Sequence, residues 1–281
     1  MQLCPTELRT RYRQGRLIPF VGAGVSASVQ WNEGGGIRRG PTWSELVDQA
    51  AQKLGFTDPE LLSVRGTNLQ ILEYFGIKRH QEFAGLTNWL AKELNAPDDA
   101  LLASPIHRAL AQLENCKLFY TTNYDDLLER GLRLHGRSCR KVVVESDMSS
   151  LDNSGTGAEV VKFHGDLEYP GHMVLSESHY ERRLRLDTPM DYKFQADLLG
   201  RVVLFIGYSF RDWNVSYLFR LINERFNQLP GSLVGKRAYI TVPNPSDFEE
   251  ELFRARNIQV IPISESNQAQ EIARLLEEIG Q

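Results

Sequence analysis

The fold of this chain is decided near its N-terminus by the stretch Leu17-Ile18-Pro19-Phe20-Val21-Gly22-Ala23-Gly24-Val25-Ser26. Five apolar residues run into a Gly-x-Gly turn, which predicts a short buried strand followed by a helix that starts near Ser26. Glycines let the backbone pass close to a pyrophosphate group, and the amide end of the helix attracts negative charge. We therefore expect an anion-binding turn at Gly22, Ala23, Gly24 and Ser26.

The turn alone leaves its role open. The third glycine of the G-x-G-x-x-G dinucleotide pattern is replaced by Ala27, and many strand-to-helix turns use glycine only for backbone geometry. Dinucleotide binding and a purely structural turn are both consistent with it. The chain has no Gly-Lys-Ser or Gly-Lys-Thr element, which argues against a P-loop nucleotide hydrolase.

Strand-like segments recur along the rest of the chain, with helical patterns between them. They are expected at residues 117–121, 141–145, 160–163, 202–207, 237–242 and 259–263. Strands that alternate with helices indicate an α/β fold with a Rossmann-like, largely parallel sheet and helices on both faces. An amphipathic helix at residues 267–279 is expected to close the chain.

Residues 42–113 have helical apolar spacing nearly throughout, as in Trp43, Leu46 and Val47. We interpret this stretch as a helical insertion or small domain within a single domain that spans residues 1–281. The preceding residues, 29–42, are rich in glycine and lack periodicity, so we expect a mobile loop there, with residues 31–40 placed to act as a lid.

The composition is that of an ordinary soluble protein, with 42% hydrophobic and 24% charged residues and a net charge of −4. This charge gives no basic footprint for nucleic acid or an anionic membrane. No apolar run approaches the roughly 20 residues that cross a bilayer, and the N-terminus lacks a signal-peptide pattern. We expect a cytoplasmic protein that contacts neither nucleic acid nor membranes directly.

The three cysteines, Cys4, Cys116 and Cys139, lie far apart in the sequence. They form no C-x-x-C pair and no even-numbered framework, so neither a zinc site nor a disulfide scaffold is indicated. We expect no bound metal and reduced cysteines.

A cluster of mostly polar residues follows the apolar residues of the strand expected at residues 117–121. It reads Thr121-Thr122-Asn123-Tyr124-Asp125-Asp126. Ligands of open α/β sheets lie beyond the carboxyl ends of the strands, so these side chains are candidates for a binding site. Helix capping is the alternative interpretation, because Thr and Asn before acidic residues also mark a helix N-terminus. Capping accounts for one or two of the six residues.

Two further strand ends carry candidate site residues. Val160-Val161-Lys162-Phe163 ends at His164-Gly165, and a histidine there can take or give a proton near neutral pH. A structural histidine at a turn is the alternative. The strand ending at Gly207 is followed by Tyr208 and Ser209, and Ser209 with the adjacent backbone is a candidate for binding ribose or phosphate.

The order of these clusters resembles the sirtuin family, and most closely its prokaryotic sirtuin-like branch. The matching motifs, after Gly-Ala-Gly-x-Ser at residues 22–26, are Pro41-Thr42-Trp43, Thr121-Thr122-Asn123-Tyr124-Asp125, Lys162-Phe163-His164-Gly165 and Gly207-Tyr208-Ser209-Phe210-Arg211-Asp212. The resemblance covers roughly residues 15–265. It implies a domain that binds NAD as its substrate.

The resemblance also implies a role for each candidate residue. The residues expected to bind the dinucleotide are Gly22, Ala23, Gly24 and Ser26 at the pyrophosphate and nearby ribose, Thr122, and Gly207 and Ser209 at the adenosine side. Asn123 and Asp125 are expected at the nicotinamide ribose and carboxamide. His164 is expected to be the catalytic base.

Departures from the family pattern bear on the reaction. Protein-deacylating sirtuins usually carry a four-cysteine zinc module soon after His-Gly, and no cysteine follows His164 in this chain. Thr122 also stands where deacylases have glutamine. We therefore expect an NAD glycohydrolase, which cleaves NAD to nicotinamide and ADP-ribose, without zinc.

Two alternatives stay open: an NAD- or ADP-ribose-binding regulatory module, and an NAD-dependent protein deacylase or ADP-ribosyltransferase. Domains of this branch look like effectors of bacterial antiphage defence that deplete NAD. They commonly work in assemblies, so a homo-oligomer or a helicase-like, Argonaute-like or sensor partner is implied.

Overall fold

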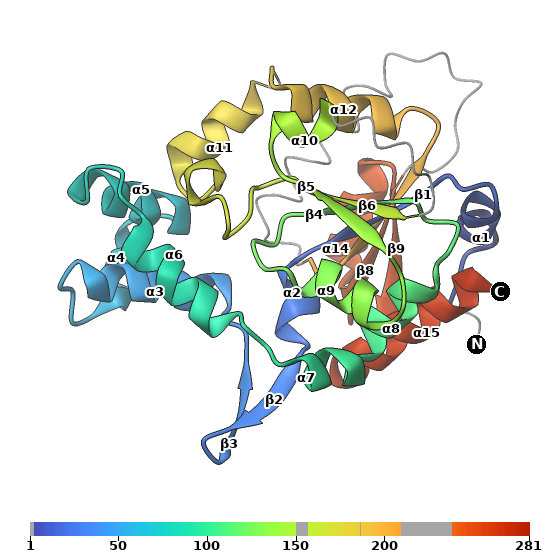
Figure 1. Ribbon diagram of the computed structural model, residues 1–281, viewed down its shortest axis with the longest axis horizontal. Helices are drawn as coiled ribbons and strands as arrows, with labels where there is room; N and C mark the ends of the chain where they lie inside the picture. Colours follow the sequence, from blue (N-terminus) through green and yellow to red (C-terminus); the bar gives the residue numbers. More distant parts are fainter. Residues whose placement is uncertain (1–2, 150–156, 186, 209–237) are drawn as a thin grey trace.

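A parallel sheet of seven strands, in the order β5-β6-β4-β1-β7-β8-β9, forms the centre of the molecule (Figure 1). The computed structural model describes residues 3–149, 157–185, 187–208 and 238–281. The strands are β1 (Leu17–Val21), β4 (Leu118–Thr121), β5 (Cys139–Val142), β6 (Ala158–Lys162), β7 (Val202–Ile206), β8 (Ala238–Pro243) and β9 (Ile258–Ile263). Every pairing between neighbours is parallel, which confirms the predicted fold class.

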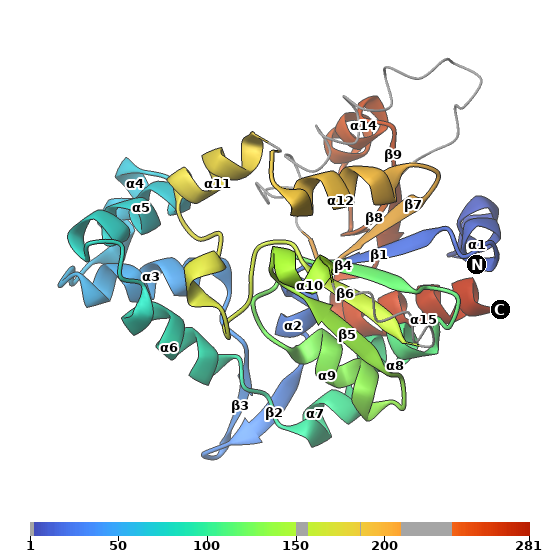
Figure 2. The ribbon, with the colours of Figure 1, turned by 45° about the horizontal axis from the view of Figure 1, so that its top comes forward.

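Helices cover both faces of the sheet, because β1 and β7 are buried along their whole length and each apolar face needs a partner. One face packs on α1 (Thr6–Arg13), α8 (Pro105–Gln112), α9 (Leu127–Leu134) and α15 (Gln268–Gly280). The other packs on α10 (Glu145–Ser149), α12 (Pro189–Leu198) and α14 (Asp247–Ala255). Figure 2 shows these layers after rotation of the view.

The helices within residues 42–113 fall into two groups. The helices α3 (Trp43–Lys53), α4 (Pro59–Arg65), α5 (Asn68–Lys78) and α6 (Ala84–Glu93) form a module to one side of the sheet (Figures 1 and 2). Its apolar core also takes in Tyr124, Met173 and Leu175 from the Rossmann part. The helices α7 (Asp98–Ala103) and α8 return the chain to the Rossmann part, where α8 packs against α15 and α9.

Residues 29–42 differ from the expected loop. They contain an antiparallel hairpin of β2 (Gln30–Glu33) and β3 (Gly36–Arg39), which extends from the body of the molecule (Figure 1). Gly34 and Gly35 both have positive φ, at 61° and 84°, which is the backbone that a two-residue hairpin turn requires. The sequence analysis missed the hairpin because strands of four residues are too short to show a period.

The arginines of this hairpin are engaged in ion pairs. Arg38 contacts Glu33 and Glu93, and Arg39 contacts Glu45 at 2.9 Å. These contacts tie β3 to α3 and α6. In this structure, the two guanidinium groups therefore bind carboxylates of the hairpin and the helical module.

The topology places a crevice at the carboxyl end of β1. On one side of β1 the sheet continues with β4, β6 and β5, and the chain then crosses to the other side of β1 to form β7. Ligands of open α/β sheets bind where the strand order reverses in this way. The four strand ends that carry the expected site residues belong to β6, β4, β1 and β7, which are adjacent in the sheet.

Glycines are required where the turns after β1 and β7 meet. A Cβ atom on Gly24 would lie 2.9 Å from the Cα of Gly207, and one on Gly207 would lie 2.7 Å from the amide nitrogen of Val25. Gly22 and Gly24 donate their N–H groups to the carbonyl oxygens of Ile206 and Gly207, at 2.8 and 2.9 Å. These contacts give the Gly-x-Gly turn a structural role, and the amides of Gly22 and Gly24 are already used.

The replacement Gly207→Ala should destabilise the fold more than Gly200→Ala. Both glycines have a φ of +80° or close to it, but a Cβ at Gly200 meets nothing within 4 Å. The left-handed backbone costs about 1–2 kcal/mol in each variant. Crowding against Val25 should add about 1–3 kcal/mol in Gly207→Ala alone. Urea unfolding measures the difference, and equal losses would show that the two turns can separate without cost.

Candidate functional site

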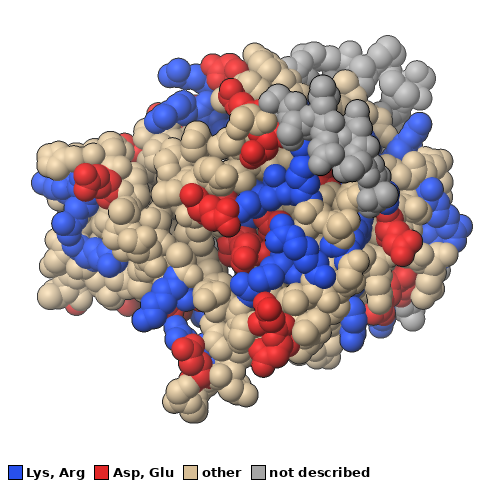
Figure 3. Space-filling view, viewed as in Figure 1, with Lys and Arg blue, Asp and Glu red and all other residues tan. Residues whose placement is uncertain are grey.

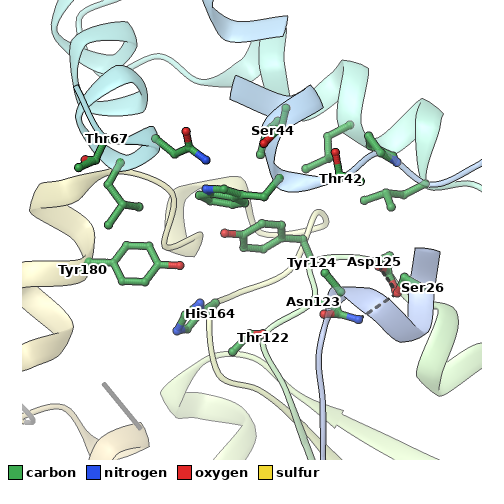
Figure 4. A pocket seen from close by; sticks show the side chains of 18 of the residues that line it. Ser26, Thr42, Ser44, Thr67, Thr122, Asn123, Tyr124, Asp125, His164 and Tyr180 are labelled. Carbon is green, nitrogen blue, oxygen red and sulfur yellow. Dashed lines mark hydrogen bonds between the residues drawn. The ribbon is translucent and has the colours of Figure 1, made fainter. Parts of the chain in front are cut away.

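A cavity of about 850 Å³ lies between the helical module and the carboxyl ends of the central strands (Figure 4). From the Rossmann part it is lined by Ala23, Ser26, Thr122, Asn123, Tyr124, Asp125 and His164. From the helical module and the residues that flank it, the cavity is lined by Pro41, Thr42, Trp43, Ser44, Leu46, Thr67, Asn68, Leu69, Leu90 and Leu94. From α11 (Glu177–Leu184) it is lined by Glu177, Tyr180 and Glu181. One wall is thus mainly polar and the other contains most of the apolar side chains.

The Asn123 amide has a defined orientation at this wall. Its Nδ2 donates to the Ser26 hydroxyl at 2.9 Å and to the Gly22 carbonyl oxygen at 3.1 Å. A carbonyl oxygen only accepts, so the amide nitrogen must face Gly22. The Oδ1 atom is buried and has no hydrogen-bond partner among the described residues. It is therefore available as an acceptor for a ligand.

Asp125 is linked to the same network and to the start of α9. Its Oδ2 accepts from the Ser26 hydroxyl at 2.8 Å, and its Oδ1 accepts from the amide of Leu127 at 3.1 Å. Burial raises the pKa of the Asp125 carboxyl, while the Lys162 ammonium and the Ser26 hydroxyl oppose that rise. Asp125 thus accepts from the first amide of α9, although the N-cap residue of that helix is Asp126. Asp125 also lines the cavity.

Thr122 joins the strand ends of β4, β1 and β7. Its hydroxyl lies 2.9 Å from the hydroxyl of Tyr208, which donates to the carbonyl oxygen of Val21 at 3.1 Å. Since that bond uses the only hydroxyl hydrogen of Tyr208, Thr122 must be the donor in the first pair.

His164 is almost completely buried at the end of β6. The ring of Tyr180 meets its imidazole edge to face, with the centroids 5.3 Å apart. The Nε2 atom is buried without a hydrogen-bond partner among the described residues. Burial and the nearby Arg183 guanidinium hold the pKa of His164 well below its usual 6.5. The ring is therefore neutral near pH 7 and has a lone pair that can accept a proton.

The structure brings six of the expected site residues to one cavity: Ala23, Ser26, Thr122, Asn123, Asp125 and His164. Gly22, Gly24 and Gly207 lie at the contact between the β1 and β7 turns. The helix α2 (Ala23–Ala27) begins three residues before the expected start at Ser26. Ser209 lies outside the described residues.

The sequence analysis named Pro41-Thr42-Trp43 as a family motif but assigned no residue of the opposite wall to the site. Thr42 and Thr67 cap the helices α3 and α5 in capping boxes with Glu45 and Gln70. These boxes are visible in the sequence and predict where the two helices begin. The capping boxes do not tell which helix N-termini face the ends of the strands. They therefore locate Thr42 and Thr67 in the sequence but do not reveal that these residues line a cavity.

The described residues contain no group of three or more His, Cys, Asp or Glu side chains arranged to hold a metal ion. All three cysteines are free. Within the same residues, none of the helices combines the length and apolar character needed to span a membrane. Figure 3 shows basic and acidic side chains interspersed over the face it displays.

The strand order and the cavity at its reversal define a Rossmann-type domain with a ligand-sized site. The family described as "SIR2-like domain" matches residues 117–261, just over half of the chain. The chain therefore belongs to the SIR2-like family.

Relatives extend the similarity beyond that segment. The chain is 27% identical to "NAD(+) hydrolase ThsA" of Acinetobacter baumannii, over 92% of this chain and 52% of that protein. It is 31% identical to "NAD(+) hydrolase ThsA" of Cytobacillus dafuensis, over 74% and 38%. It is 25% identical to "Defense-associated sirtuin 2" of Bacillus subtilis, over 79% and 20%. The chain thus spans between a fifth and about half of the length of these relatives.

Replacing Ser26 by Ala should destabilise the site more than replacing Ser28 by Ala. Ser26→Ala removes the partner of both Asp125 Oδ2 and Asn123 Nδ2, which are buried, and should cost about 1–3 kcal/mol. Ser28 donates one partly buried hydrogen bond to the carbonyl oxygen of Val25, and its loss should cost about 0.5 kcal/mol. Urea unfolding compares the two, and a Ser26→Ala loss no larger than that of Ser28→Ala would argue against the network.

Proposed function

We propose that the chain hydrolyses NAD at the nicotinamide–ribose bond and releases nicotinamide and ADP-ribose. The observation that carries the proposal is that Asn123 and His164 both line the cavity. Each has a buried polar atom that lacks a hydrogen-bond partner among the described residues. A buried polar group without a partner is costly, so its retention points to a ligand. The relatives named NAD(+) hydrolase support the same reaction.

The dinucleotide would bind along the carboxyl ends of β4, β1 and β7. Ala23, Ser26 and Thr122 line the cavity and would contact it directly. Gly22, Gly24 and Gly207 would shape the turn against which it lies, since the N–H groups of the first two are occupied. Ser209 completes the proposed set at the adenosine side.

Cleavage of NAD produces an oxocarbenium-like ribose and neutral nicotinamide, so the site has mainly to orient the substrate and stabilise charge. Asn123 Oδ1 would accept a hydrogen bond from the attacking water or a ribose hydroxyl. As the bond from the anomeric carbon to nitrogen breaks, the water oxygen bonds to that carbon. The proton released from the water passes to the neutral His164 imidazole.

Asp125 would hold the carboxamide of nicotinamide. Each of its carboxylate oxygens accepts one hydrogen bond within the protein. A carboxylate oxygen has two acceptor sites, so one remains on each for the carboxamide N–H groups. The bonds from Ser26 and Leu127 would fix the carboxylate in place.

The biological setting belongs to the same proposal. We infer a cytoplasmic, zinc-independent effector of antiphage defence that depletes NAD, in keeping with the defence-associated relative. Permanent activity would be toxic, which favours regulation by self-assembly or by a helicase-like, Argonaute-like or sensor partner. Nicotinamide release that rises more steeply than linearly with protein concentration would support self-assembly, and linear dependence would count against it.

The variants His164→Ala and Asn123→Ala should nearly abolish cleavage, whereas His172→Ala should not. A positioned base contributes about 10²–10⁴-fold to rate, and His172 is an exposed histidine in the turn that follows β6. Nicotinamide and ADP-ribose release from NAD are measured by chromatography, with thermal unfolding as a check of folding. Wild-type turnover in folded His164→Ala and Asn123→Ala would refute the assignment. Binding of NAD without release by the wild-type chain would favour a binding module.

The rate of cleavage should stay nearly constant from pH 8 down to pH 6. A histidine with its ordinary pKa of about 6.5 would be roughly three-quarters protonated at pH 6 and unable to accept a proton. The lowered pKa of His164 keeps the imidazole neutral through that range. The pH dependence of kcat tests this, and a decline centred near pH 6.5 would contradict it.

A further inference from the structure

Lys162, the last residue of β6, places a cation in the interior beneath the cavity. Its side chain has no exposed surface. The ammonium donates to the backbone carbonyl oxygen of Asp125 and lies 3.4 Å from Glu129 Oε1 and 3.3 Å from Asp166 Oδ2. Both carboxylates are also buried, with 1% and 3% of their side chains exposed.

The three contacts of Lys162 belong to three different parts of the chain. Asp125 lies in the loop after β4, two residues from Asn123, and Asp166 lies two residues after His164 in the loop that follows β6. Glu129 lies in the first turn of α9. One ammonium group therefore joins the two loops that carry Asn123 and His164, and it anchors them to a helix.

The surrounding charges keep this lysine protonated. Burial acts to lower the pKa of Lys162, but the carboxylates of Glu129, Asp125 and Asp166 together outweigh it and raise that pKa. Asp166 is held in turn by Lys141 at 3.2 Å and by the amide of Glu168 at 2.9 Å. Asp166, which binds Lys162 from the His164 loop, is thus itself held in place by other groups.

Neutral hydrogen bonds also join the two loops. The amide of Leu167 donates to the carbonyl oxygen of Tyr124 at 3.1 Å, and the hydroxyl of Tyr124 donates to the carbonyl oxygen of Val174 at 2.6 Å. A buried hydrogen bond that involves a charged group is stronger than a neutral one. Within the described residues, Lys162 is the cation that contacts both the loop after β4 and the loop after β6.

We propose that Lys162 is a positioning residue for cleavage, which sets the placement of Asn123 relative to His164 by holding the Asp125 carbonyl and the Asp166 carboxylate together. This inference rests on the proposed NAD hydrolysis. Lys162 does not line the cavity, so it acts through the two loops and not on the substrate.

The consequence of losing this contact should fall on the chemical step. A displacement of about 1 Å in a reacting group can cost about 10²-fold in rate. Lys162 contacts Asp125, Glu129 and Asp166, whereas most of the cavity wall belongs to other segments, including Pro41–Trp43 and the turn at Ala23. Substrate binding should therefore be kept largely intact while alignment is lost.

The test compares three variants with the wild-type chain in steady-state NAD hydrolysis. We expect Lys162→Met to lower kcat by about 10²-fold, with KM changed by less than about threefold. Lys162→Arg should recover part of kcat, because a cation is again present to bind both loops. Lys193→Met should leave kcat unchanged: Lys193 is a partly buried cation that binds Glu159 of β6 and Asp197 of α12, away from both loops.

A fourth variant, Asp166→Asn, keeps the inference testable if Lys162→Met does not fold. It preserves the size of the side chain but weakens its attraction to the ammonium, and it should lower kcat more than it changes KM. Thermal unfolding identifies which variants are folded.

The outcomes separate this inference from the proposed function. An active wild-type chain whose folded Lys162→Met or Asp166→Asn variant retains wild-type kcat would overturn the positioning role alone. Equal losses of kcat in Lys162→Met and Lys193→Met would also overturn it, since they would indicate general destabilisation. A folded wild-type chain that neither binds nor hydrolyses NAD would instead overturn the proposed function.

Discussion

Gly24 donates its backbone N–H to the carbonyl oxygen of Gly207 at 2.9 Å, and the space between the two turns has no room for a side chain. This contact holds the ends of β1 and β7 together at the edge where the strand order reverses. It also directs α2 so that Ser26 reaches Asp125 and Asn123 on the neighbouring strand end. The polar wall of the cavity therefore depends on a backbone approach that only glycine permits.

The cavity combines two walls of different chemistry. The Rossmann part supplies side chains whose orientation is fixed by hydrogen bonds, and the helical module supplies much of the apolar surface. The two parts share one apolar core through Tyr124, Met173 and Leu175. Because the hydroxyl of Tyr124 also donates to the carbonyl oxygen of Val174 at 2.6 Å, the loop that carries Asn123 is packed into the same junction.

Buried charge is concentrated beneath this site. Asp125, Glu129, Lys162 and Asp166 are all removed from water, and burial raises the pKa of Asp125 and Glu129. Buried ion pairs contribute little net stability, because desolvation offsets their attraction. These charges lie between the loops that carry Asn123 and His164. Positioning of the two loops therefore accounts for the buried charges better than a gain in stability does.

The sequence by itself determined the local features: the strands of the main sheet, the helical patterns, the order of the motifs and hence the family and fold class. These follow from short-range patterns of apolar residues, glycines and caps. It did not reveal the hairpin at residues 30–39, whose strands are too short for periodicity. Only the tertiary structure decided that Asn123 presents its carbonyl oxygen, that helix starts of the insertion face the strand ends, and that Lys162 joins two loops. Each of these depends on contacts between residues far apart in the chain, which no local pattern encodes.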